Sequence, residues 1–340
     1  MNNSFGLSKV KNIVAISSCK GGVGKSTVAA GLARALAAQG LSVGLLDADI
    51  HGPSLPTLFN LPSVQVHSNE FKMIIPVEAQ GLKLMSFGFL LGDAPAVMRG
   101  PIVTRYIQQL LLQTDWGSLD YLIIDMPPGT GDVQLTITQS ARLTGAVIVT
   151  TRQTLSLVDV ARGILMFEKV QVPILGVIDN MAYFVCPDCD AKHHLFGSSH
   201  TLQERFGVKT LVEIPLIASL QLEPYMKEGA QALLKALEQQ GQSTVALPQV
   251  GFDSQFIQVK FADGKQWQLK NRDVRAACMC ALCINELTGQ KLIEEGKIRP
   301  DIAPKEIAPL GNYALSITWN DGHSSGIYPY TLLQSLGRES

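Results

Sequence analysis

The sequence has no long apolar run, no basic block and no cysteine framework of the kind found in secreted proteins. No stretch approaches the roughly 18 apolar residues that cross a bilayer, and the first residues lack the features of a signal peptide. Charged residues make up only 17% of the chain, and the formal net charge is −1. A broad positive surface for nucleic acid is therefore disfavoured. These absences predict a soluble, cytoplasmic protein that binds neither membrane nor nucleic acid.

Apolar residues, in contrast, are plentiful. They make up 46% of 340 residues, which is enough for a large core and more than one comfortable domain needs. A polar stretch punctuated by glycine and proline separates two parts of different character. We therefore predict a domain over residues 1–240, a linker over 241–252 and a small domain over 253–340.

A glycine-rich stretch near the start has the pattern of a phosphate-binding loop. It follows a short apolar run at 13–16 and precedes an alanine-rich helical pattern at 28–39. In such a loop, backbone N–H groups and the helix N-terminus hold phosphates. Lys25 would reach the β- and γ-phosphates of ATP, and Ser26 would hold Mg²⁺. The nucleotide-binding stretch consists of Cys19, Lys20, Gly21, Gly22, Val23, Gly24, Lys25, Ser26 and Thr27.

Two positions set this loop apart from the general pattern. Cys19 stands where the pattern has glycine, and Lys20 adds a second lysine. The sequence Lys20 to Ser26 resembles the deviant Walker A loop of dimeric ATPases such as the MinD, ParA and Mrp groups. That resemblance implies a homodimer in which Lys20 crosses to the partner's nucleotide.

Acidic residues follow two further apolar strands. Residues 41–46 lead into Asp47-Ala48-Asp49, and 119–124 lead into Asp125. Asp125 has the Walker B position and would hold the Mg²⁺ shell. Asp49 is the candidate for positioning the attacking water, with capping of the following turn as the alternative. Strands and helices alternate to about residue 240, which predicts an α/β fold with a doubly wound, mostly parallel sheet.

A C-x-x-C pair follows another predicted strand, at Cys186 and Cys189. Two thiolates are too few for a closed site in one chain. A zinc site completed by His193 or His194 and a redox dithiol are alternatives. The dimer implied by Lys20 favours a third arrangement, in which two chains supply four cysteines to a bridging [4Fe–4S] cluster.

The small domain has the signals of an α+β unit. Two alternating segments pass through Asp-Gly turns and predict hairpins, and residues 273–287 have a helical pattern. Three cysteines open that helix and need a fourth ligand for tetrahedral zinc, for which His323 beside the second turn is suitable. Buried free thiols and a second cluster-handling site are the alternatives. The predicted zinc ligands are Cys278, Cys280, Cys283 and His323.

Residues 10 to about 240 resemble the Mrp/ApbC family of iron–sulfur cluster carrier ATPases. Beside the loop and Asp125, the resemblance rests on Asp47-Ala48-Asp49, on 98–101 and 125–132, on Asn180-Met181 and on the Cys186/Cys189 pair. It implies an ATPase that accepts a cluster from the assembly machinery and passes it to recipient apoproteins, with Asn180 at the adenine. Cys19 and the appended unit point to the plastid-type scaffold branch.

The appended unit resembles the N-terminal zinc domain of γ-butyrobetaine hydroxylase-like proteins, since three cysteines are followed by Asp-Gly-His. Two other functions remain open from the residues. A MinD/ParA-like nucleotide-switched regulator would leave the cysteine pair without a role. A GTPase-like metal-insertion factor would need a carboxylate for guanine, which Asp179 offers. Many relatives carry a small domain before the ATPase, whereas about ten residues precede the first strand here.

Overall fold

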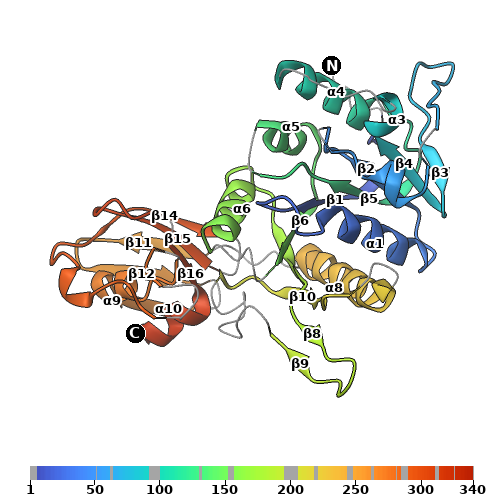
Figure 1. Ribbon diagram of the computed structural model, residues 1–340. Helices are drawn as coiled ribbons and strands as arrows, with labels where there is room; N and C mark the ends of the chain where they lie inside the picture. Colours follow the sequence, from blue (N-terminus) through green and yellow to red (C-terminus); the bar gives the residue numbers. More distant parts are fainter. Residues whose placement is uncertain are drawn as a thin grey trace.

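The structure is a computed structural model in which the chain forms two units (Figure 1). The residues that it describes are 6–50, 52–61, 64–91, 100–129, 132–151, 157–194, 206–217, 221–242, 248–261, 264–280, 282–284, 290–310, 314–324 and 326–339. Of the stretches that carry the family resemblance, 125–132 lies partly outside them, as do residues 98 and 99.

An eight-stranded sheet forms the centre of the first unit. All neighbouring strands run parallel except the last pair, as the alternation of strands and helices predicts. Strands in its middle are buried along their whole length, because helices cover both faces. The order is β10 (Thr210–Glu213), β7 (Ile174–Asn180), β6 (Gly145–Thr151), β1 (Val10–Ser17), β5 (Leu119–Asp125), β2 (Val43–Asp47), β4 (Leu82–Ser86) and β3 (Val77–Ala79).

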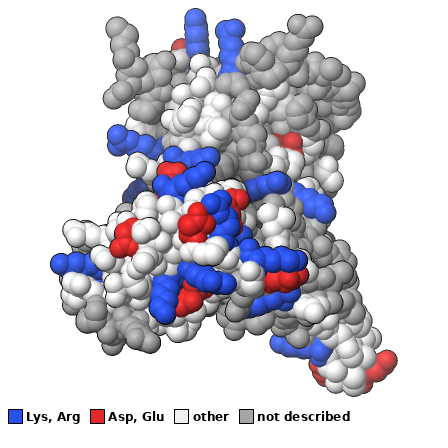
Figure 2. Space-filling view, turned by 90° about the vertical axis from the view of Figure 1, so that its left-hand side faces the viewer, with Lys and Arg blue, Asp and Glu red and all other residues white. Residues whose placement is uncertain are grey.

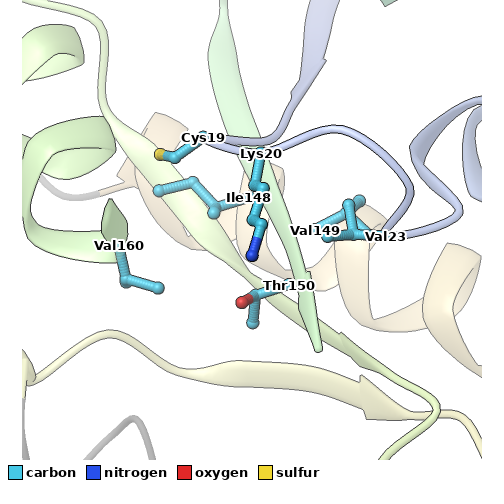
Figure 3. Close-up of a pocket in the computed structure, with 7 residues that line it drawn as sticks. All are labelled: Cys19, Lys20, Val23, Ile148, Val149, Thr150 and Val160. Atoms are coloured by element: carbon cyan, nitrogen blue, oxygen red, sulfur yellow. The ribbon is translucent and has the colours of Figure 1, made fainter. Parts of the chain in front are cut away.

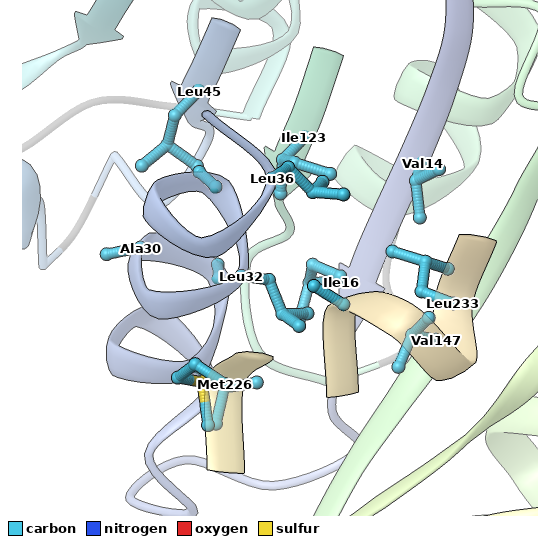
Figure 4. Packing of buried hydrophobic residues seen from close by; sticks show 14 of the residues in the cluster. Val14, Ile16, Ala30, Leu32, Leu36, Leu45, Ile123, Val147, Met226 and Leu233 are labelled. Carbon is cyan, nitrogen blue, oxygen red and sulfur yellow. The ribbon is translucent and has the colours of Figure 1, made fainter. Parts of the chain in front are cut away.

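Helices α1 (Lys25–Ala37) and α8 (Glu223–Gln242) pack on one face of this sheet. Figure 4 shows their leucine and methionine side chains against Ile16 of β1 and Val147 of β6. Successive side chains of a strand point to opposite faces, so Ala15, the residue before Ile16, packs in a second core on the other face. That core is covered by α4 (Gly100–Leu112), α5 (Asp132–Ser140) and α6 (Leu157–Lys169). Short helices α2 (Leu55–Leu58) and α3 (Gly88–Leu91) lie in the connections.

The topology gathers the candidate residues of the first unit at one edge. The phosphate loop follows β1, Asp49 follows β2, and Asp125 and Asn180 end β5 and β7. Because these strands are parallel, all four C-terminal ends meet at the same edge of the sheet. Beyond β7 the chain forms a small hairpin of β8 (Phe184–Val185) and β9 (Lys192–His193), which projects from the body (Figure 1).

The second unit contains two antiparallel sheets around a core that includes Trp267 and Trp319. Both predicted hairpins are present. One is formed by β12 (Phe256–Lys260) and β13 (Gln266–Lys270), the other by β15 (Ala314–Trp319) and β16 (Gly326–Pro329). One sheet consists of β11 (Gln249–Phe252), β12 (Phe256–Lys260), β13 (Gln266–Lys270) and β17 (Arg338–Glu339), the other of β14 (Pro304–Leu310), β15 (Ala314–Trp319) and β16 (Gly326–Pro329). Helices α9 (Asn271–Ala276) and α10 (Tyr330–Leu336) and a 3₁₀ turn η3 (Glu295–Lys297) complete the unit.

Two predicted boundaries differ from the structure. The helix expected over 273–287 is wrong, because α9 ends at Ala276 and the three cysteines follow it in turns. The linker expected over 241–252 is shorter, since α8 continues to Gln242 and β11 begins at Gln249.

Helix α6 also lies between the two units (Figure 1). One of its faces packs Val160, Ala161 and Ile164 in a cluster with Leu310 and residues of β15 and β16. Leu310 and Ile164 are fully buried there. The described helices include none that is long and apolar enough to cross a membrane. On the side of the second unit, Lys and Arg side chains alternate with Asp and Glu rather than forming one positive area (Figure 2).

Candidate functional site

The phosphate loop has the backbone that its glycines permit. Gly22 and Gly24 have φ values of 79° and 81°, in the region that side chains disfavour. A Cβ at Gly24 would also collide with Nδ2 of Asn180. The loop turns directly into α1, whose first hydrogen bond runs from Val28 N to Gly24 O. Free N–H groups at this helix start are suited to a phosphate group.

Lys25 and Asp125 form a buried ion pair beneath the loop. Lys25 Nζ donates to Oδ1 of Asp125, and the Ser26 side chain also hydrogen-bonds this carboxylate. Oδ2 of Asp125 is buried and has no hydrogen-bond partner among the described residues. Burial raises the pKa of Asp125, and the charge of Lys25 opposes this rise. A carboxylate oxygen left open beside a serine hydroxyl fits Mg²⁺, which prefers oxygen ligands and phosphate partners.

Asp49 lies in the loop that follows β2. Asp49, the predicted water-positioning residue, is half-buried and accepts a hydrogen bond from Gly52 N at 3.3 Å. It is near enough to Asp125 for its charge to raise that group's pKa. Its proposed part in hydrolysis remains a prediction.

Asp47 is the site residue that the sequence interpretation missed. It is fully buried and accepts hydrogen bonds from Ser54 N at 2.8 Å, Leu55 N at 3.2 Å and Ser86 Oγ at 3.1 Å. Burial, and then the charge of Asp125, raises its pKa to about 6. Asp47 therefore fastens the loop that carries Asp49. The available signal was its place as the last residue of a strand that is buried throughout.

Cys19 points away from the phosphate-binding side of the loop. Its sulfur lies over Gly163 of α6, where an added Cβ would be 2.6 Å from Sγ. Cys19 and Lys20 line a small hollow with Val160 and residues of β6 (Figure 3). Lys20 is exposed and extends toward Thr150 in this view. Exposure suits a residue that reaches a second subunit, and that role remains a prediction.

Asn180 contacts the phosphate loop from β7. Its Nδ2 donates to Val23 O at 2.9 Å, and its Oδ1 accepts from Met181 N at 3.1 Å. Both ends of the amide are engaged with backbone in this arrangement. The structure thus brings Asn180 to the loop, and its contact with adenine remains a prediction.

Cys186 and Cys189 lie in the turn between β8 and β9. The turn closes with hydrogen bonds from Cys186 N to Ala191 O at 2.9 Å and from Asp190 N to Cys186 O at 3.0 Å. The N–H of Asp188, then the thiol and N–H of Cys189, lower the pKa of Cys186. Thiolate is the form that binds metal. Within the described residues, no third Cys, His, Asp or Glu joins this pair as a metal ligand.

The four predicted ligands of the second unit do come together. Sγ atoms of Cys278, Cys280 and Cys283 lie 3.2, 3.5 and 4.0 Å from Nε2 of His323. All four ligand atoms lie within 4.8 Å of one another and all four residues are buried. Hydrogen bonds to the thiols of Cys280 and Cys283 raise the pKa of Cys278 well above its ordinary value. The charges of Cys280 and Cys283 also raise this pKa, because thiolates repel one another. A divalent cation would offset that repulsion, so the donor set fits a tetrahedral metal.

Known proteins match both units. A family model for the NUBPL iron-transfer P-loop NTPase, ParA, matches residues 9–247, and one for the N-terminal region of γ-butyrobetaine hydroxylase-like proteins matches 249–334. The chloroplastic Fe-S cluster assembly factor HCF101 of Arabidopsis thaliana is 43% identical over 98% of this chain and 66% of its own length. An iron-sulfur cluster carrier protein of Aquifex aeolicus is 51% identical over 61% of this chain and 58% of its own.

Among solved structures, a nucleotide-binding protein of Archaeoglobus fulgidus in complex with ADP has a TM-score of 0.58 at 40% identity. The match covers 67% of this chain and 91% of that one. The present chain spans 66% of the length of the plant relative. The family model covers well over half of the chain, and the matched range includes the phosphate loop, Asp125 and the cysteine pair. The chain therefore belongs to the NUBPL-type iron-transfer P-loop NTPase family.

Proposed function

We propose that this protein is an ATP-dependent iron–sulfur cluster carrier that acts as a homodimer. Two subunits would hold a [4Fe–4S] cluster as cargo between their Cys186/Cys189 pairs and pass it to recipient apoproteins. The observation that carries the proposal is the exposed, preformed thiol turn, which offers two ligands and finds no third among the described residues. Four thiolates are the usual ligand set of such a cluster, and a second subunit would complete it.

The hairpin is connected to the nucleotide site by a short stretch of chain. Asn180 contacts the phosphate loop through Val23, and Cys186 follows it by only six residues. A shift of the loop on ATP binding would therefore act close to the base of the thiol turn. Within the loop, Lys25 would stabilise the transferred phosphoryl charge, while Ser26 and Asp125 would hold Mg²⁺. Lys20 would contribute from the partner subunit, and Asp49 would position water.

Anaerobic reconstitution tests the cargo site. The full chain and its Cys186→Ser/Cys189→Ser variant would be loaded with iron and sulfide, followed by absorbance and iron counting. We expect the variant to bind little cluster and to lose transfer to a model apo-ferredoxin. His193→Ala on the same hairpin is the matched control and should load normally, whereas its failure would favour a site that includes histidine. Equal loading of the double variant and the unaltered protein would sink the proposal.

The same samples separate this proposal from its main rival. A cluster shared between subunits predicts that loading converts monomer to dimer, as measured by light scattering. A MinD/ParA-like regulator predicts ATP-dependent sedimentation with anionic vesicles or DNA and no cluster-dependent dimer.

We further propose that Cys278, Cys280, Cys283 and His323 hold structural zinc. Three thiolates and one imidazole in a buried cluster are a typical zinc set, and a closed site without a free position suits a structural role. Metal analysis of the full Cys186→Ser/Cys189→Ser chain should give one zinc, which His323→Ala should remove. A cytoplasmic location remains a prediction of the sequence.

A further inference from the structure

Arg275 connects the two segments that supply the ligands of the second unit. It is the next-to-last residue of α9 and is only 8% exposed. Its Nε donates to Oδ2 of Asp321 at 2.9 Å, and its Nη1 donates to Sγ of Cys283 at 3.4 Å. Oδ1 of Asp321 accepts the N–H of His323 at 3.0 Å. One guanidinium group therefore touches a thiol ligand and, through one carboxylate, fixes the turn that carries the histidine.

The net charge of the ligand set explains why a cation such as Arg275 is favourable beside Cys283. Three thiolates around a divalent cation leave a net charge of −1, and this charge lies in an apolar core with Ile257, Val274 and Trp319. Burying an uncompensated charge costs several kcal/mol. Arg275 supplies positive charge directly at one sulfur. Asp321 is more exposed than Arg275, with side-chain exposures of 24% and 9%, so solvent screens much of its negative charge.

At Cys278 the contact is with a neutral group. The hydroxyl of Tyr328 bonds to Cys278, and Trp319 Nε1 donates to that hydroxyl at 2.9 Å. Tyr328 is a neutral donor, so it orients a sulfur without offsetting its charge. Among the described side chains that make these contacts, Arg275 is the cationic one.

We infer that Arg275 is a positioning residue for the metal, which holds Cys283 and the His323 turn in ligating geometry and offsets the charge of the thiolates. This inference rests on the proposed metal site. Partners that hydrogen-bond metal ligands change metal affinity by about 10–100-fold when they are removed. We therefore expect Arg275 to control how firmly the metal is retained.

Zinc release from the full-length, zinc-loaded chain tests this role. Arg275→Met keeps most of the apolar stem but removes the charge and both donors, and we expect zinc transfer to a chromogenic chelator to become about 10–100-fold faster. Arg275→Lys keeps the charge and should restore much of the retention. Arg272→Met is the matched control, because Arg272 lies exposed on the same helix, and it should release zinc like the unaltered chain.

A spectroscopic readout separates positioning from general damage to the fold. In the Co²⁺-loaded chain, loss of a charged donor at Cys283 should move the thiolate-to-cobalt charge-transfer band to longer wavelength in Arg275→Met, and Arg275→Lys should move it back. Arg275→Met with unchanged release and an unchanged band would overturn the inference, as would Arg275→Lys behaving like Arg275→Met. Failure of the unaltered chain to bind metal would instead overturn the metal site itself.

Discussion

Asp47 and Asp125 stand side by side at the ends of β2 and β5, yet among the described residues only Asp125 forms an ion pair with a cation. The two residues are paired in the parallel register, and both are fully buried. Lys25 balances Asp125, whereas Asp47 receives backbone N–H groups and a hydroxyl. This difference gives the two carboxylates opposite roles: one is open to a metal, and the other supports the loop beside it.

We predict that the buried carboxyl group of Asp47 makes the protein less stable as the pH rises. Its folded-state pKa of about 6 lies above its ordinary value of 3.8. Between these values the native state holds a proton that the unfolded state has lost, so the free energy of unfolding falls as pH rises through this window. The loss should approach about 3 kcal/mol above pH 6, since each unit of pKa corresponds to about 1.4 kcal/mol. Below pH 4 this contribution to the pH dependence disappears.

Urea unfolding at intervals from pH 4 to pH 7 measures this effect. Asp47→Asn should flatten the fall in stability, because an amide does not ionise. Asp190→Asn replaces an exposed acid at a positive φ that asparagine tolerates, and it should retain the slope of the unaltered chain. An identical slope in Asp47→Asn would contradict the prediction.

Lys25 is expected to be indispensable for hydrolysis. Lys25→Ala should lower the rate of ATP hydrolysis by at least about 100-fold, the usual cost of losing one group that stabilises the transition-state charge. It should also weaken folding, because Asp125 would keep a buried charge without a partner. Phosphate release assays measure the first effect. The control is Lys11→Ala, which breaks an exposed ion pair with Asp120 at the other end of β1 and should leave hydrolysis intact.

At the scale of single residues, the sequence was sufficient to predict the site residues that belong to a short motif. The places of the loop and Asp125 were predictable, and so was the clustering of the three cysteines with His323. Asp47 and Arg275 were not, because their partners lie on other elements and no short motif records them. Asn180 is intermediate: its proximity to the nucleotide loop was implied, but its bond to Val23 was not.

At the scale of elements, the strands were predictable because buried parallel strands leave continuous apolar runs. The three cysteines misled the helix prediction in the second unit. Their spacing continues a helical pattern, yet four ligands must converge on one point, and Cys280 O instead accepts hydrogen bonds from Cys283 N and Ile284 N in a tight turn. Convergence of the ligands thus overrides local helical preference after Ala276.

Contact between the phosphate loop and α6 leads to a prediction about two residues. Gly163→Ala would place its Cβ 2.6 Å from Sγ of Cys19, closer than atoms pack, so we expect a loss of about 1–3 kcal/mol. Cys19→Gly removes the sulfur and should suppress that loss. The two substitutions should therefore be coupled by about 0.5–3 kcal/mol in a double-mutant cycle of urea unfolding.

A glycine on α8 provides the control for this cycle. Gly229→Ala would bring a Cβ 3.1 Å from Val212 without meeting Cys19, so its effect should add to that of Cys19→Gly. Additive effects for Gly163→Ala as well would show that the loop and α6 do not constrain each other.

At the scale of the molecule, α6 joins the P-loop unit to the second unit. The sequence did not indicate this interface, because its apolar residues look like ordinary core positions of their own elements. Leu310 ends β14, and Ile327 lies in β16, but both pack in a cluster with Val160 and Ile164 of α6. Gly163 on the same helix lies against Cys19. The second unit is thus one helix away from the phosphate loop.

This arrangement predicts that nucleotide stabilises both units together. A ligand at a concentration 100 times its dissociation constant raises the free energy of unfolding by about 2.7 kcal/mol. If the two units unfold together because their interface is buried, the second unit is stabilised as well. Trp267 and Trp319 both report on the second unit. Trp116 is the third tryptophan of the chain and belongs to the first unit, where its Nε1 has no hydrogen-bond partner within the described part of the chain. Phenylalanine is therefore a suitable replacement at that position.

In a Trp116→Phe background, Mg²⁺ and ATP should raise the midpoint of the thermal transition that tryptophan fluorescence reports. Leu310→Asp should abolish that rise, because a carboxylate at a fully buried interface position separates the units, while the zinc content stays at one per chain. Leu292→Asp is the control, since this leucine of the second unit is 53% exposed. If Leu310→Asp kept the full nucleotide effect, the two units would communicate by a route other than α6. If neither chain showed the effect, the interface would bind the units without coupling their stability.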